Sequence, residues 1–191
     1  MIITISGTPG TGKTKIAKML SKKTRIKLIR LSQFIKKHKL YCGYDAKRKT
    51  LIVDPKRLKK RVQKLINEQD VIIEGHLAHF IPSDLAFILR LDPKHLEERL
   101  KRRGWNSEKV RENVSAEILS IIYWEALQNN KRVLQIDTTG KSSDAVVKRI
   151  LNILKSKKYR SDEVEWLEKY QEYLSDCCEK EDTRRGRASF I

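Results

Sequence analysis

The chain has 191 residues, 39% of them hydrophobic, and a formal net charge of +18. This length fits one domain, or one domain with a short extension, and it suffices to bury a full core. No apolar run is as long as a membrane span, and Met1 leads directly into an apolar stretch, so we expect a soluble, untargeted cytoplasmic protein with no membrane partner. Cys42, Cys177 and Cys178 form an odd set without metal-ligand spacing, which favours free thiols in a reducing compartment.

The charge is distributed unevenly along the chain. Residues 1–160 contain 37 Lys and Arg against 15 Asp and Glu, a net charge of +22, whereas residues 161–182 have a net charge of −7 and are followed by three arginines. A body this basic attracts polyanions, and RNA is the natural candidate beyond nucleotides. The alternative is a lysine-rich surface of the thermophilic kind, but such surfaces carry matching glutamates, which this body lacks.

The first element of the chain is the strongest signal in the sequence. The apolar run Met1–Ile5 predicts a short buried strand, and Gly7–Thr14 then matches G-x-x-x-x-G-K-[ST], the phosphate-binding loop. The backbone N–H groups of such a loop and the N-terminus of the next helix form a nest for phosphate oxygens. We expect Lys13 to reach the β- and γ-phosphates of a nucleotide and the Thr14 hydroxyl to coordinate its Mg²⁺ ion.

Hydrophobic periodicity and capping residues predict the elements that follow the loop. They are a helix from about Gly12 to Lys23, a strand over Arg25–Leu31, a helix over Gln33–His38 capped by Ser32, a turn-rich stretch over Tyr41–Asp45, and a basic helix from Pro55 to Leu65.

A third strand, Val71–Ile73, ends in polar side chains. Glu74 and His76 follow it, and because the carboxyl ends of parallel strands meet at the ligand crevice, both should emerge beside the phosphate loop. A carboxylate there can hold the magnesium shell through water, and His76 could shuttle a proton near neutral pH. The alternative for both is a solvated strand end. We interpret His79 as a satisfied loop histidine without a role in the site.

A fourth strand, Leu85–Leu91, leads through an Asp-Pro pair into a helix whose end carries Arg99, Arg102 and Arg103. Gly104 and an aromatic residue follow. A glycine break among arginines is typical of a mobile flap that closes over transferring phosphates, whose charge arginine stabilises. The alternative is an ordinary basic helix end favoured by the helix dipole.

The rest of the chain is predicted to add a helix over residues 112–129 with Trp124 in the core, a strand over Val133–Asp137, and a core helix from Ser143 to about Leu154. The acidic residues 162–175 have aromatic and leucine side chains at helical spacing. We interpret them as an amphipathic helix that packs on its own domain, the alternative being a docking element for a basic partner. A polar end that we expect to be disordered follows.

Five buried strands that alternate with helices and start from a phosphate loop predict an α/β fold, a doubly wound five-stranded parallel sheet. A helical insert after the second strand and an arginine-bearing flap after the fourth are the layout of small-molecule phosphotransferases. We expect the kinase domain to end at about residue 158 and residues 159–191 to be an acidic helical extension with a disordered tail.

Three segments together resemble the adenylate kinase isoenzyme 6 family: Gly7–Thr14, Leu40–Asp45, and Arg99 with Arg103–Asn106. The resemblance covers about residues 1–155. It implies a P-loop nucleoside monophosphate kinase fold with a monophosphate-binding insert at about 30–53 and a lid at about 102–112. Members phosphorylate nucleoside monophosphates, also hydrolyse ATP, and act in small ribosomal subunit maturation.

The resemblance also implies the site residues and the partners. Its ATP contacts match Gly10, Gly12, Lys13, Thr14, Lys15 and Arg103. The expected catalytic set is Lys13, Glu74, His76 and Arg103, with Mg²⁺ held by Thr14 and, through water, by Glu74. ATP and AMP are the expected substrates, a small-subunit ribosomal protein and pre-rRNA are the expected partners, and the family is monomeric.

Two positions depart from the family pattern. The family has Asp-x-His where this chain has Glu74-Gly75-His76, so the carboxylate sits one methylene further out and the magnesium shell can change. The family often has arginine where Lys36 stands, and lysine keeps the charge but loses the bidentate fork.

Three functions follow as hypotheses. The first is an adenylate kinase that converts MgATP and AMP into two ADP. The second is an assembly factor whose ATPase cycle switches its affinity for a ribosomal protein or pre-rRNA. The third is another small P-loop kinase, acting on shikimate, a sugar acid or a nucleic-acid end.

Overall fold

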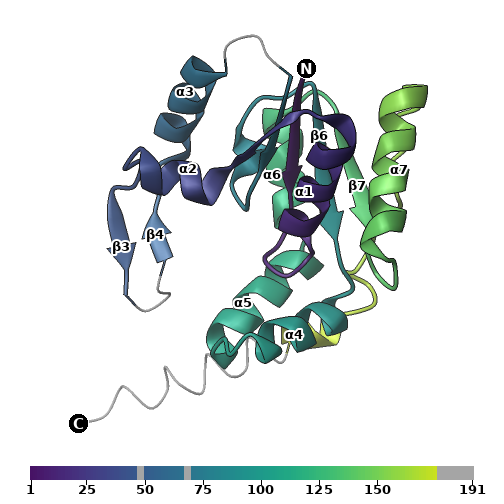
Figure 1. Cartoon of the computed structure of the whole chain (residues 1–191). Helices are drawn as coiled ribbons and strands as arrows, with labels where there is room; N and C mark the ends of the chain where they lie inside the picture. Colours follow the sequence, from purple (N-terminus) through teal and green to yellow (C-terminus); the bar gives the residue numbers. More distant parts are fainter. Residues whose placement is uncertain (47–49, 67–69, 176–191) are drawn as a thin grey trace.

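The structure is a computed structural model that describes residues 1–46, 50–66 and 70–175. The polar end with Cys177 and Cys178 lies outside the described residues. Five parallel strands form the central sheet in the order β2-β5-β1-β6-β7, which confirms the predicted doubly wound fold (Figure 1). Their bounds are Ile2–Ser6 for β1, Lys27–Arg30 for β2, Val71–Glu74 for β5, Leu85–Arg90 for β6 and Val133–Asp137 for β7.

Helices cover both faces of the sheet because its central strands are buried on both sides. Helices α1 (Lys13–Thr24) and α7 (Ser143–Ser156) pack on one face, where Ile5, Leu20 and Ile150 share a core cluster. On the other face lie α3 (Pro55–Leu65) and α6 (Ile121–Asn129), each with its own cluster. The phosphate loop joins β1 to α1 at the carboxyl ends of the strands (Figure 1).

The insert after β2 differs from the prediction in two respects. Helix α2 spans Leu31–Lys37, so Ser32 lies inside the helix and Arg30 occupies the N-cap position without a side-chain cap. The turn-rich stretch forms an antiparallel hairpin of β3 (Gly43–Asp45) and β4 (Thr50–Ile52). Strands of three residues are too short to show an alternating pattern, so periodicity could not reveal them.

The single helix expected over residues 112–129 is wrong. Helix α4 (Pro93–Arg102) turns at Gly104 into α5 (Ser107–Ile118), and α6 begins only after Ser120, which has a φ of 54°. A left-handed residue ends a helix, and non-glycine residues rarely adopt this conformation, so apolar periodicity alone did not reveal the break. Trp124, predicted to be in the core, is 59% exposed.

The C-terminal segment, residues 158–175, packs on the domain as predicted but is not one helix. Residues 161 and 162 run along the edge strand β7, where Asp162 N–H donates to Gln135 O at 3.0 Å and Gln135 N–H donates to Ser161 Oγ at 2.8 Å. Helical backbone begins only at Gln171. The segment thus covers a sheet edge that would otherwise offer unpaired backbone groups.

Its last described turn reaches the α4–α5 pair. Tyr170, Tyr173 and Leu174 pack against the cluster formed by α4 and α5, and Lys169 Nζ lies 2.9 Å from Asp92 Oδ2. A short 3₁₀ turn, η1 (Ala78–Phe80), lies between β5 and β6. Among the described residues, no helix combines the length and apolar character needed to cross a membrane.

Candidate active site

Two glycines give the phosphate loop its shape. Gly7 has a φ of 137°, and a Cβ there would lie 2.4 Å from the backbone oxygen of Leu89, so only glycine fits against β6. Gly10 has a φ of 109°, and a Cβ there would lie 2.6 Å from Leu96 of α4. The loop is therefore held between the sheet and α4, the helix that precedes the predicted lid.

Lys13 begins α1 and is buried, with 8% of its surface exposed. Its Nζ donates to the backbone oxygen of Thr8 at 2.9 Å, inside the loop. Burial lowers the pKa of Lys13 to about 8, against the opposing attraction of Glu74 and Glu117. A buried ammonium with one backbone partner has donor capacity left for the phosphates that the loop motif predicts.

Thr14 and Glu74 meet at the mouth of the loop. Thr14 Oγ1 donates to Glu74 Oε1 at 2.9 Å, and Arg30 Nε lies 3.8 Å from Glu74 Oε2. The carboxylate is 6% exposed. A hydroxyl and a carboxylate oxygen side by side are hard oxygen donors of the type that Mg²⁺ takes in nucleotide sites, so the residues fit this ion. The extra methylene of Glu74 leaves it in contact with Thr14.

The predicted nucleotide contacts surround one cavity of about 440 Å³. It brings together the following residues: Pro9, Gly10, Gly12, Lys13, Thr14, Lys15, Lys18 and Arg103. Arg103 joins it from the turn after α4, and Arg99 of the same helix donates through Nη1 to the backbone oxygen of Gly10 at 3.1 Å. The cavity is thus lined by cations and by loop backbone, the chemistry of a polyphosphate site.

A second cavity of about 570 Å³ lies between α2, the hairpin and the end of β5. Ser32, Lys36, Tyr44, Thr50 and His76 supply its polar groups, and leucine, isoleucine and valine side chains supply the rest. His76 therefore lines this cavity and not the phosphate-loop cavity. The insert expected to hold the monophosphate thus has a concave wall of suitable size, with Lys36 as its cation.

His76 has a lowered pKa. The imidazole keeps an exposed surface, but protein surrounds most of it, and this partial desolvation together with the nearby Lys13 lowers its pKa to about 4. At pH 7 the ring is neutral. It can accept a hydrogen bond or a proton, but a charge change near neutral pH, which the sequence suggested, does not fit this environment.

Sequence reasoning missed a buried network behind the loop. Thr8 Oγ1 donates to Glu117 Oε2, and Arg90 Nε donates to Glu117 Oε1 at 2.7 Å. Arg90 also donates through Nη2 to Glu117 O at 2.8 Å and to Ser120 Oγ at 3.0 Å. Arg90 and Glu117 are 1% and 2% exposed. Two signals in the sequence could have indicated this network: Arg90 is a charge within an apolar strand, and Glu117 is a charge within an amphipathic helix.

His79 is satisfied, as predicted. It is 1% exposed, its Nδ1 lies 3.0 Å from Ser6 Oγ, and its Nε2 lies 3.0 Å from Glu125 Oε2. Burial lowers its pKa to about 4, so the ring is neutral at pH 7 and joins β1 to α6 through hydrogen bonds.

Comparison with known proteins agrees with this geometry. A family model described as an AAA domain matches residues 3–120. A protein named "Putative adenylate kinase" from Thermococcus onnurineus is 41% identical over 176 residues, which are 91% of this chain and 96% of the relative. The chain belongs to the "Putative adenylate kinase" family. As a member of that family it is a P-loop nucleotide kinase, a phosphotransferase.

Solved structures share the fold of this family member. Deoxyadenosine kinase from M. mycoides, with dCMP and dCDP bound, is 18% identical with a TM-score of 0.54 and aligns 82% of this chain with 100% of its own. Shikimate kinase from Bacteroides thetaiotaomicron is 15% identical with a TM-score of 0.57 and aligns 81% of this chain with 98% of its own. At these identities the likeness concerns the fold.

Proposed function

We propose that the protein is an adenylate kinase that transfers the terminal phosphoryl group of MgATP to AMP and releases two ADP. The observation that carries this proposal is the pair of cavities on either side of the carboxyl end of β5, one built by the phosphate loop and one by the insert. Donor and acceptor would meet where Lys13, Glu74 and His76 lie.

The reaction asks little covalent chemistry of the protein. An oxygen of the AMP phosphate attacks the γ-phosphorus of ATP, and the bond from that phosphorus to the β,γ-bridging oxygen breaks, leaving ADP on both sides. Lys13 and Arg103 line the donor cavity and would neutralise charge on the transferring group, with Arg99 holding the loop through Gly10. Thr14 and Glu74 would hold Mg²⁺, which offsets phosphate charge when bound.

The neutral His76 suits the acceptor side of this scheme. AMP is already a dianion near neutral pH, so it needs no base, and a neutral imidazole can donate one hydrogen bond without adding charge. Lys36 supplies the cation of the acceptor cavity. As a point charge it orients a phosphate less strictly than arginine, so a weaker hold on the monophosphate is part of the proposal.

The test is ADP production from MgATP with and without AMP. We expect turnover that depends on AMP and that falls at least about a hundredfold in Lys13→Ala, the size typical for loss of one transition-state cation or donor. Lys22→Ala is the matched control, because Lys22 is exposed on the same helix outside the cavity. AMP-independent turnover of equal rate in both variants would contradict the proposal.

A second proposed activity is ATP hydrolysis in small ribosomal subunit biogenesis and rRNA maturation, as in the isoenzyme 6 family. The net charge of +22 over residues 1–160 favours it, since such a body attracts RNA. The same assay separates the two activities. Slow hydrolysis without AMP, accelerated by purified small-subunit ribosomal protein or rRNA, supports the assembly role, and hydrolysis indifferent to both argues against it.

A further inference from the structure

Helix α6 carries an apolar stripe on its outer side. Ile121, Trp124 and Leu127 recur every three residues, so they share one side of the helix, and they are 41%, 59% and 41% exposed. The inner side of the same helix is occupied by Ile122 and Ala126, which pack against Ile88 of β6. The helix is therefore apolar on both sides although only one side meets the core. An outer side of this kind is typical of an interaction surface.

A groove of about 690 Å³ continues the stripe. It lies between the α5–α6 junction and the C-terminal segment, and Leu119, Trp124 and Leu167 form part of its walls. Leu119 and Leu167 are 41% and 51% exposed. Trp166 lines the groove too, and its buried indole N–H has no hydrogen-bond partner among the described residues. We call Leu119, Ile121, Trp124, Leu127 and Leu167 the α6 patch.

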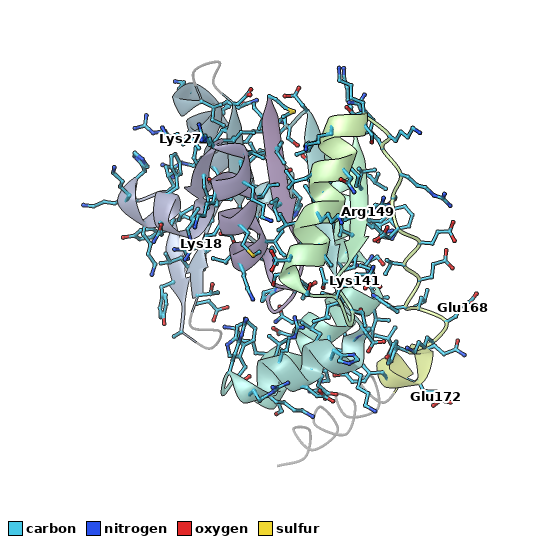
Figure 2. The ribbon with its side chains drawn as sticks, turned by 45° about the vertical axis from the view of Figure 1, so that its right-hand side comes forward. Lys18, Lys27, Lys141, Arg149, Glu168 and Glu172 are labelled. Carbon is cyan, nitrogen blue, oxygen red and sulfur yellow. The ribbon has the colours of Figure 1, made fainter. Side chains whose placement is uncertain are left out.

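The groove is acidic in a protein that is otherwise strongly basic. Its charged lining residues are Asp162, Glu163, Glu165 and Glu168 against Arg160 alone. Asp162 forms an ion pair with Arg149, whose Nη2 lies 3.1 Å from Asp162 Oδ1. Within residues 1–46, 50–66 and 70–175, no cation lies within ion-pair distance of the other three carboxylates. Figure 2 shows Glu168 and Glu172 on the C-terminal segment, away from the side that carries Lys18 and Lys27.

We propose that the α6 patch and its groove bind a basic amphipathic segment of a partner protein. Apolar side chains of the segment would cover Trp124 and Leu167, and its Lys or Arg side chains would face Glu163, Glu165 and Glu168. An apolar helix face in a groove is a recurring mode of recognition, and tryptophan is enriched among residues that dominate such interfaces. The carboxylates disfavour RNA and anionic membranes, which leaves a cationic segment as the complementary ligand.

This inference does not rest on the proposed kinase activity. None of the residues that line the groove lines either nucleotide cavity. Failure of one proposal therefore leaves the other standing, and ADP production serves as an internal control for variants of the groove.

The probe is a fluorescent helical peptide of about 18 residues with leucine and tryptophan on one face and lysine on the other. Its twin carries glutamate in place of every lysine. We expect the lysine peptide to bind the full chain at least about tenfold more tightly than the twin, with the difference shrinking as salt is added. Binding is measured by fluorescence anisotropy of the labelled peptide.

Two variants test the site itself. Trp124→Ala and the double variant Glu165→Lys/Glu168→Lys should each weaken binding of the lysine peptide about tenfold and leave ADP production unchanged. Because all three side chains are exposed, the variants should keep the wild-type circular dichroism spectrum. The matched controls are Ile52→Ala, an apolar residue on β4 that is 48% exposed, and Glu172→Lys, an acid of the same segment outside the groove lining.

Three results would overturn the proposal. The first is equal binding of the two peptides, which would reveal indiscriminate apolar adhesion, and the second is a lack of binding by the lysine peptide at millimolar concentration. The third is a dimer in light scattering that Trp124→Ala dissociates, which would make a second copy of the chain the occupant.

Discussion

At the scale of single residues, burial lowers the pKa of both Lys13 and His76 but leaves them with different charges at pH 7. Lys13 has a lowered pKa of about 8 and stays mostly charged at pH 7, whereas His76 with a pKa of about 4 is neutral. Both shifts arise mainly from desolvation, which penalises the charged form of a cation. The sequence identified both residues and their neighbourhood, but it could not show how much protein surrounds each ring or ammonium.

We predict that His76 titrates well below an ordinary histidine. NMR of the imidazole ring protons in the nucleotide-free protein should give a midpoint near 4, against the usual 6.5. The pH profile of kinase activity should therefore contain no titration near pH 6.5 that depends on His76, and His76→Gln should leave that part of the profile unchanged. A midpoint at 6 or above would mean that water reaches the ring freely and that the neutral role is wrong.

The buried pair of Arg90 and Glu117 predicts a large stability effect. Glu117→Ala leaves the Arg90 guanidinium buried without its carboxylate and also removes the acceptor of the Thr8 hydroxyl. Loss of one member of a buried pair costs about 3–5 kcal/mol, which should appear as a lower midpoint in urea unfolding. Glu98→Ala, an exposed glutamate on α4, should change the free energy of unfolding by less than about 0.5 kcal/mol. Equal effects of the two substitutions would contradict the network.

At the scale of elements, the sequence predicted whatever was long and strongly periodic. The five sheet strands, α1, α3 and α7 agree closely with the prediction. The central strands are continuous apolar runs, as buried parallel strands usually are. The errors lie where local pattern and tertiary contact disagree. Residues 162–175 have helical periodicity, but hydrogen bonds with β7 draw their first part into an extended path. Trp124 has the spacing of a core residue but faces outward.

Asp92 links α4 to the C-terminal segment. It caps α4 and accepts hydrogen bonds from Lys169 and Tyr170 of the C-terminal segment. Burial alone would raise its pKa, but the hydrogen bonds from Lys169, Tyr170 and His95 lower it to about 2. A carboxylate with a lowered pKa stabilises the folded state above its unfolded pKa of 3.8, and this stabilisation is lost as the pH falls toward 2.

Asp92→Asn should therefore loosen the C-terminal segment and keep the helix cap, since asparagine also caps well. We expect a loss of about 1–2 kcal/mol in the free energy of unfolding at pH 7, with faster amide exchange in residues 169–175. The difference from wild type in the free energy of unfolding should become smaller below pH 4. Asp144→Asn, at an exposed first-turn position of α7, is the control. If the difference in the free energy of unfolding stays constant down to pH 2, the effect of the substitution does not depend on the charge of Asp92.

At the scale of the whole molecule, charge is separated in space as it is along the chain. Lys18 and Lys27 lie on the side of α1 and β2, and the acidic C-terminal segment lies beyond α7 (Figure 2). Helix α3 is the most basic element, with six Lys and Arg and no acid in eleven residues. It stands beside the insert that lines the acceptor cavity. A polyanion is thus expected on this side of the molecule and a cationic partner at the α6 patch.

The salt dependence of RNA binding tests this separation. Each phosphate contact of a single strand contributes about 0.7 to the slope of log K against log salt, so Lys60→Gln/Lys64→Gln on α3 should reduce the slope by about 1.4. Both lysines are exposed and one helical turn apart. Lys148→Gln/Lys155→Gln removes the same charge from α7 and should change the slope by less than half as much. If the two pairs have equal effects, RNA responds to net charge alone and α3 has no special part in its binding. If neither pair changes the slope, neither helix contacts the RNA.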